Sequence, residues 1–101
     1  MARELRQKVE FVIDRTKQYF QDPDAPSFLP YILSWLQEVA EELGKSEPNR
    51  EMLMGLARAI GRGVTDDYQF SESPVGTAIL EIVSDIVHYY ESQSHNDKSS
   101  K

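Results

Sequence analysis

The chain has 101 residues, and its 11 lysines and arginines against 17 aspartates and glutamates give a formal net charge of −6 at pH 7. This length is typical of one domain, and a 40% share of hydrophobic residues is enough to build a compact core. Because cysteine is absent, a disulfide framework, a thiolate zinc site and a cysteine nucleophile are excluded. The acidic balance argues against nucleic acids and anionic membranes as partners, since both are bound through clusters of lysine and arginine.

The sequence lacks an apolar run of the length that a signal peptide or a membrane span requires. Residues 1–8 are rich in charge, and the longest mostly apolar stretch, Phe28–Leu33, has six residues and includes Pro30. A membrane-spanning helix needs about 20 such residues. The sequence therefore predicts a cytoplasmic protein without membrane association.

Four segments show the alternating 3–4 spacing of apolar residues that is typical of amphipathic helices. The first is expected over residues 3–21, and it ends at the turn 22–26, where two prolines and two aspartates disfavour a helix. The second is expected over residues 27–43, between an N-cap at Ser27 and a C-cap at Gly44.

The third helix is expected over residues 47–62, where Gly61 and Gly63 are interpreted as a helix end that needs left-handed residues. The fourth is expected over residues 73–92, with Ser73 as N-cap and a proline at the first helical position. Its many β-branched residues make a strand the alternative, but the helical spacing persists over four turns and favours the helix.

Four helices joined by short connections predict an all-α fold, an antiparallel four-helix bundle with a disordered C-terminal tail. The single domain is expected over residues 1–91. The tail, residues 92–101, contains serine, glutamine, histidine, asparagine, aspartate and lysine and has nothing to bury.

The sequence offers little for catalysis or metal binding. No Gly-x-Ser-x-Gly elbow occurs, and no glycine-rich phosphate loop is complete. Asp85, His88 and Glu91 share one side of the fourth helix and are weak candidates for a metal site, although acidic residues three positions from a histidine are common on exposed helices. We therefore expect no cofactor and no enzymatic activity.

The connection 64–72 is acidic but carries two aromatic residues, Tyr68 and Phe70. Both rings are expected either to seal the end of the bundle or to form a recognition loop, with Asp66 and Asp67 steering a basic or mixed partner. A calcium loop formed by these acids is disfavoured, because the alternating ligands and the central glycine are missing.

The second helix is apolar on two sides, because Phe28, Tyr31 and Trp35 lie away from its main stripe. Phe11 similarly lies on the far side of the first helix. Either the second helix has three neighbours in the fold, or these aromatic side chains form an interface with a second copy or another protein.

The sequence thus favours a small acidic interaction or regulatory module over an enzyme, with a protein partner, itself as a homodimer, or both. The alternative is a bundle that binds a small ligand or a divalent metal. The candidate interaction residues are Trp35, Tyr31, Phe28, Phe11, Tyr68, Phe70, Asp66 and Asp67.

Overall fold

A computed structural model describes residues 2–23 and 25–99, with side chains over residues 3–23 and 25–91. Within this part the chain forms helices and no strands, which confirms the all-α fold class. The helices are α1 (Ala2–Tyr19), α2 (Leu29–Leu43), α3 (Arg50–Thr65), α4 (Tyr68–Glu72) and α5 (Pro74–Ser99).

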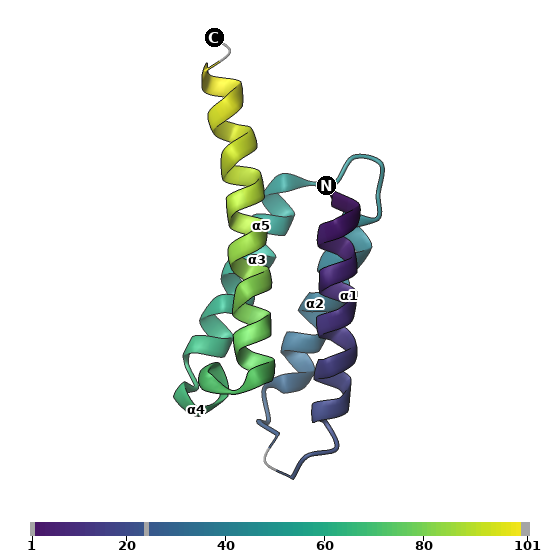
Figure 1. Ribbon diagram of the computed structural model, residues 1–101, viewed down its shortest axis with the longest axis vertical. Coiled ribbons are helices and arrows are strands. Elements are labelled where there is room, and N and C mark those ends of the chain that lie inside the picture. Colours follow the sequence, from purple (N-terminus) through teal and green to yellow (C-terminus); the bar gives the residue numbers. More distant parts are fainter. Residues whose placement is uncertain (1, 24, 100–101) are drawn as a thin grey trace.

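The four long helices run alternately in opposite directions (Figure 1). Helices α1 and α3 each pack against both α2 and α5, so α1 lies diagonally opposite α3, and α2 lies diagonally opposite α5. The short helix α4 packs against α3 and α5 at one end of the bundle.

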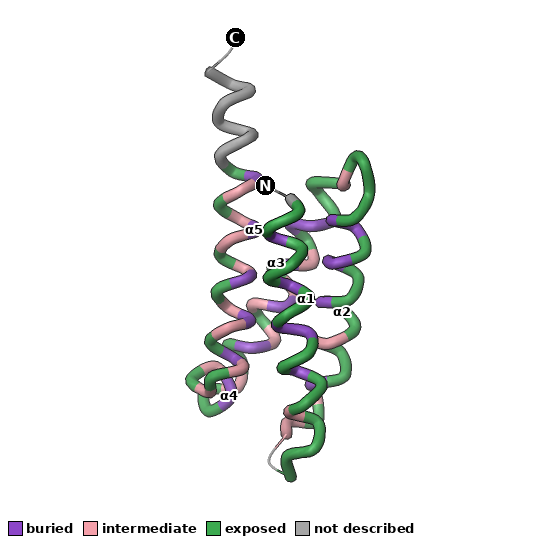
Figure 2. Tube along the Cα trace, turned by 45° about the vertical axis from the view of Figure 1, so that its right-hand side comes forward, coloured by how far each residue is buried: buried purple, intermediate pink, exposed green. Residues whose placement is uncertain are grey.

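The predicted apolar stripes face inward along the long helices, where the buried positions recur every three or four residues (Figure 2). The largest fully buried hydrophobic side chains are Val9, Leu29, Ile32, Leu36, Val39, Leu53, Ile60, Val64, Ile79 and Ile86. Together they form one continuous core.

Two helix starts differ from the prediction. Phe28, not Ser27, occupies the N-cap of α2 and provides no side-chain cap, because its side chain has no hydrogen-bond acceptor. Its ring packs edge-to-face on Phe70 at 5.5 Å and thereby fixes the entrance of the helix. Helix α3 begins three residues late, because the side chain of Asn49 accepts a hydrogen bond of 3.0 Å from the Met52 amide and caps it.

The prediction that Gly61 and Gly63 close the third helix is wrong. Helix α3 continues through both to Thr65, and neither glycine has a positive φ. A Cβ on Gly63 would lie only 3.0 Å from Cδ1 of Ile32, so this glycine allows α2 and α3 to approach each other closely. The next residue, Val64, is fully buried and extends the apolar stripe.

The predicted loop 64–72 contains helix α4, so the bundle has a fifth helix. Asp67 caps α4, since its carboxylate accepts a hydrogen bond of 3.0 Å from the Phe70 amide. Directly after α4, the hydroxyl of Ser73 accepts a hydrogen bond of 3.0 Å from the Gly76 amide. The predicted N-cap at Ser73 is therefore confirmed.

Helix α5 runs to Ser99. The polar tail that the sequence predicts, residues 92–101, lies outside the residues whose side chains the structure describes.

Candidate functional site

The two aromatic residues of the 64–72 segment lie in opposite environments. Phe70 is buried, and its ring stacks on Tyr19 with 5.8 Å between centroids. It therefore seals the end of the bundle, as one of the two interpretations expects. Tyr68 is 72% exposed and does not contribute to this seal.

The predicted acidic residues of this segment serve the local backbone. Asp67 caps α4, as described above, and Asp66 is exposed at the C-cap of α3, where its amide donates to the carbonyl of Arg62. One carboxylate oxygen of Asp67 is thus already engaged by the Phe70 amide at 3.0 Å.

Of the aromatic residues on the second side of α2, Phe28 and Trp35 pack against the core as half-buried side chains. Cζ3 of Trp35 lies 3.8 Å from the position that a Cβ on Gly63 would occupy, so the indole is close to α3. Tyr31 is 67% exposed. Two of the three residues thus contribute to the fold itself.

The weak metal candidates do not come together. Asp85 accepts a hydrogen bond of 3.3 Å from Nζ of Lys8 on α1, while Nδ1 of His88 lies 3.4 Å from the hydroxyl of Ser84. Glu91 is exposed. Over residues 3–23 and 25–91, no three acidic or histidine side chains are placed to hold a metal ion.

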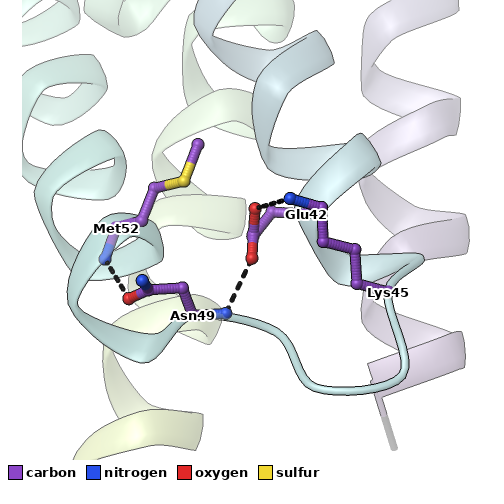
Figure 3. Close-up of polar contacts among 4 residues, drawn as sticks. All are labelled: Glu42, Lys45, Asn49 and Met52. Carbon is purple, nitrogen blue, oxygen red and sulfur yellow. Dashed lines mark hydrogen bonds and ion pairs between the residues drawn. The ribbon is translucent and has the colours of Figure 1, made fainter.

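A buried carboxylate lies at the connection between α2 and α3 (Figure 3). Glu42 is 4% exposed, and its Oε2 accepts a hydrogen bond of 2.8 Å from the Asn49 amide while its Oε1 accepts one of 2.9 Å from Nζ of Lys45. These bonds, the first above all, hold the pKa of Glu42 below its usual range. Both oxygens are occupied, so Glu42 fixes the connection rather than offering a reactive group.

An open groove of about 580 Å³ with a mostly apolar lining lies between α1 and α5. Phe11 forms one wall and is 62% exposed, whereas Val12 and Ile82 are buried beneath it. We call this feature the α1/α5 groove. It is lined by Glu4, Gln7, Lys8, Phe11, Val12, Ala78, Glu81, Ile82 and Asp85.

A smaller hollow adjoins the α1/α5 groove at the ion pair of Lys8 and Asp85. It has a volume of about 150 Å³, shares this pair with the α1/α5 groove and adds Leu5 and Tyr89 to the lining. From Ala78 to Tyr89, a rise of 1.5 Å per residue gives a length of about 16 Å, or about three helical turns.

Acidic groups dominate the rim of the α1/α5 groove. Three carboxylates, those of Glu4, Glu81 and Asp85, stand against one lysine, Lys8. Lys8 pairs with Asp85 at 3.3 Å. Over the residues whose side chains are described, Glu4 and Glu81 form no ion pair, so their charges are unmatched.

The sequence identifies only part of this groove. Phe11 is recognised because it lies off the apolar stripe of its helix, but the remaining lining residues are not, since nothing local indicates that the flank of α1 meets α5. The available signal is the spacing of Ala78, Ile82 and Asp85, which places them on one side of α5.

Comparison with protein-family models, with curated proteins and with solved structures finds no match to this chain. Among its described residues, none of the helices combines the length and apolar character needed to cross a membrane.

Proposed function

We propose that this protein is a non-enzymatic interaction module that binds another protein through the α1/α5 groove. The observation that carries the proposal is the position of Phe11, a large apolar side chain that is 62% exposed beside an apolar floor. Exposed aromatic side chains next to apolar hollows are typical of protein-binding surfaces, because covering them removes a large apolar area from water.

The floor and the rim of the groove contribute to binding in different ways. Phe11 and Ala78 offer an accessible apolar surface that a partner side chain covers without disturbing the core, and the buried Val12 and Ile82 lie behind it. The charged rim orients the partner and raises its association rate, since rim charges act mainly on encounter and specificity.

A small apolar ligand is the second candidate, because about 580 Å³ lies within the usual range of ligand pockets. Such pockets enclose most of their ligand, roughly 70–90% of its surface. The exposure of Phe11 leaves this groove too open for that, which favours a partner that brings its own covering surface.

Self-association through the second side of α2 has less support. Phe28 and Trp35 already pack against the core, so of the aromatic residues on that side Tyr31 alone is exposed. A single exposed tyrosine offers little of the area that a stable dimer needs, about 800 Å² from each copy.

The proposal is tested by photo-crosslinking in the cells that make the protein. A photoreactive phenylalanine replaces Phe11 in one variant and Tyr31, equally exposed but on α2, in the other. We expect a discrete crosslinked partner from position 11 only. The identified partner is then purified, and Phe11→Ala is expected to weaken its binding at least about tenfold.

Two results contradict the proposal. Either both positions yield the same crosslinked proteins, or the purified partner binds Phe11→Ala as tightly as the unchanged chain. Because Phe11 is largely exposed, the variant is expected to fold, and its thermal unfolding curve checks this.

A further inference from the structure

We infer that the occupant of the α1/α5 groove is a cationic amphipathic helix of another protein, lying along the groove for about three turns. This inference rests on the proposed function and adds the chemistry of the partner. It is drawn from the shape of the groove, its apolar wall and floor, and its unmatched charges.

The shape favours a helix over a single side chain. The two hollows meet at the surface ion pair of Lys8 and Asp85, and together they extend beside α5 from Ala78 to Tyr89, over about 16 Å. An amphipathic helix of about three turns has this length, and its apolar side chains at positions i, i+3 or i+4 and i+7 recur along such a groove.

The apolar surface is arranged on one side of the ion pair between Lys8 and Asp85. There the ring of Phe11 stands beside Ala78 and Ile82. The guanidinium of Arg15 lies 5.7 Å from the centroid of the Phe11 ring, so one edge of this apolar wall is already cationic. The apolar lining between Phe11 and α5 suits a partner side chain such as leucine.

The charges determine the sign of the partner. Glu81 on α5 and Glu4 on α1 stand on the groove without an ion pair among the described residues, whereas the only lysine of the lining is paired with Asp85. A helix whose lysines or arginines lie toward Glu4 and Glu81, away from Arg15, matches both free carboxylates. The net charge of −6 steers the same kind of partner at longer range.

A second copy of the chain is a poorer occupant. Two α1/α5 grooves facing each other would oppose Glu4 and Glu81 with the same carboxylates of the other copy, and like charges in contact oppose association. An acidic amphipathic helix meets the same repulsion.

The test uses three fluorescent peptides of about 15 residues, long enough to form a helix. The first combines a leucine stripe with flanking lysines. The second replaces every lysine by glutamate, and the third has the composition of the first but scattered leucines. Binding to the full chain is measured by fluorescence anisotropy, and the bound surface is mapped by amide chemical shifts.

We expect the first peptide to bind at least about tenfold more tightly than the other two, with shifts concentrated at Phe11, Ala78 and Ile82. Phe11→Ala and Glu81→Lys are each expected to weaken it. The matched controls are Tyr31→Ala, which removes a similarly exposed aromatic residue, and Glu38→Lys, which makes the same charge change on α2. Neither control is expected to change the affinity for the first peptide.

The outcomes separate the inference from the proposed function. If the glutamate peptide binds as well as the lysine peptide, and Phe11→Ala weakens both, the cationic partner is wrong while the groove as a docking site stands. If the scattered peptide binds equally, the attraction is general and the helical occupant is wrong. If Phe11→Ala changes the binding of no peptide and of no crosslinked partner, both the inference and the proposed function fail.

Discussion

Among the glycines, Gly76 is the one at which the fold tolerates an added side chain least. It lies in the first turn of α5, where a Cβ would overlap the carbonyl oxygen of Phe70. This carbonyl is not free to move, because the Phe70 ring is buried between Tyr19 and Phe28. We expect Gly76→Ala to lower the free energy of unfolding by about 1–3 kcal/mol, measured by urea denaturation.

The matched control is Gly55→Ala on α3. A Cβ on Gly55 meets nothing within 4 Å, and the residue is exposed in a helix interior. Alanine loses less backbone entropy than glycine on folding, so this variant is expected to gain about 0.5–1 kcal/mol. An unchanged urea midpoint for Gly76→Ala would show that α4 yields to the added methyl group.

Through Glu42, the stability of the protein is expected to depend on pH. The Asn49 amide and Lys45 lower the pKa of Glu42, so its ionised form stabilises the fold at every pH above the usual pKa of 4.5. This contribution is lost as the pH falls through the lowered pKa. Glu42→Gln presents an NH₂ group to one of these two donors. We expect it to be less stable at pH 7, with a difference that narrows below about pH 4.5.

Thermal unfolding of both proteins between pH 3 and 7 measures this effect. Glu41→Gln is the control, since Glu41 neighbours Glu42 but is exposed, and such a change is expected to alter stability by no more than about 0.5 kcal/mol. A Glu42→Gln difference that stays constant over this pH range would mean that the carboxylate charge is irrelevant.

At the scale of helices, the long elements were predictable because their apolar stripes repeat over several turns. Helix α4 was not, because five residues are too few for a period, and its cap Asp67 looked like one of several loop acids. The prediction that Gly61 and Gly63 end the third helix is wrong for a different reason. Gly63 serves packing against Ile32 of α2, a contact that the local sequence does not encode.

The candidate site likewise combines features that one helix reveals with features that depend on contacts between helices. Phe11 was identified from its own helix, but the groove forms only when α1 meets α5, and the pair that bridges it, Lys8 and Asp85, is separated by 77 positions. For Trp35 the sequence leaves packing within the fold and an interface both open, because Gly63, which lies close to its indole, is on another helix. Helical periodicity identifies an apolar side chain that lies off the main stripe of its helix, but it does not show which other helix packs against that side chain.

Trp35 is therefore expected to act on stability. Its half-buried ring packs against the core near α3, so Trp35→Ala should lower the free energy of unfolding by about 1–3 kcal/mol, less than for a fully buried tryptophan. Tyr31→Ala, on the same side of α2 but 67% exposed, should stay within about 0.5 kcal/mol. Urea denaturation measures both, and equal effects would contradict this assignment.

At the scale of the whole molecule, the exposed aromatic residues of the described chain come from different elements. Phe11, Tyr31 and Tyr68 belong to α1, α2 and α4, and the less exposed Phe20 directly follows α1. Each copy carries a net charge of −6, and the α1/α5 groove has unmatched carboxylates on its rim. Both features oppose a dimer, which needs about 800 Å² of complementary surface from each copy.

We therefore expect a monomer of 11.6 kDa by sedimentation equilibrium over a wide concentration range, at low and at physiological salt. Salt is the informative variable, because it screens the repulsion between like-charged copies but leaves the apolar surface available. A mass that doubles only at high salt would mean that charge alone keeps the copies apart. A dimer at low salt would contradict the prediction, and loss of that dimer in Phe11→Ala or in Tyr31→Ala would identify the surface that forms it.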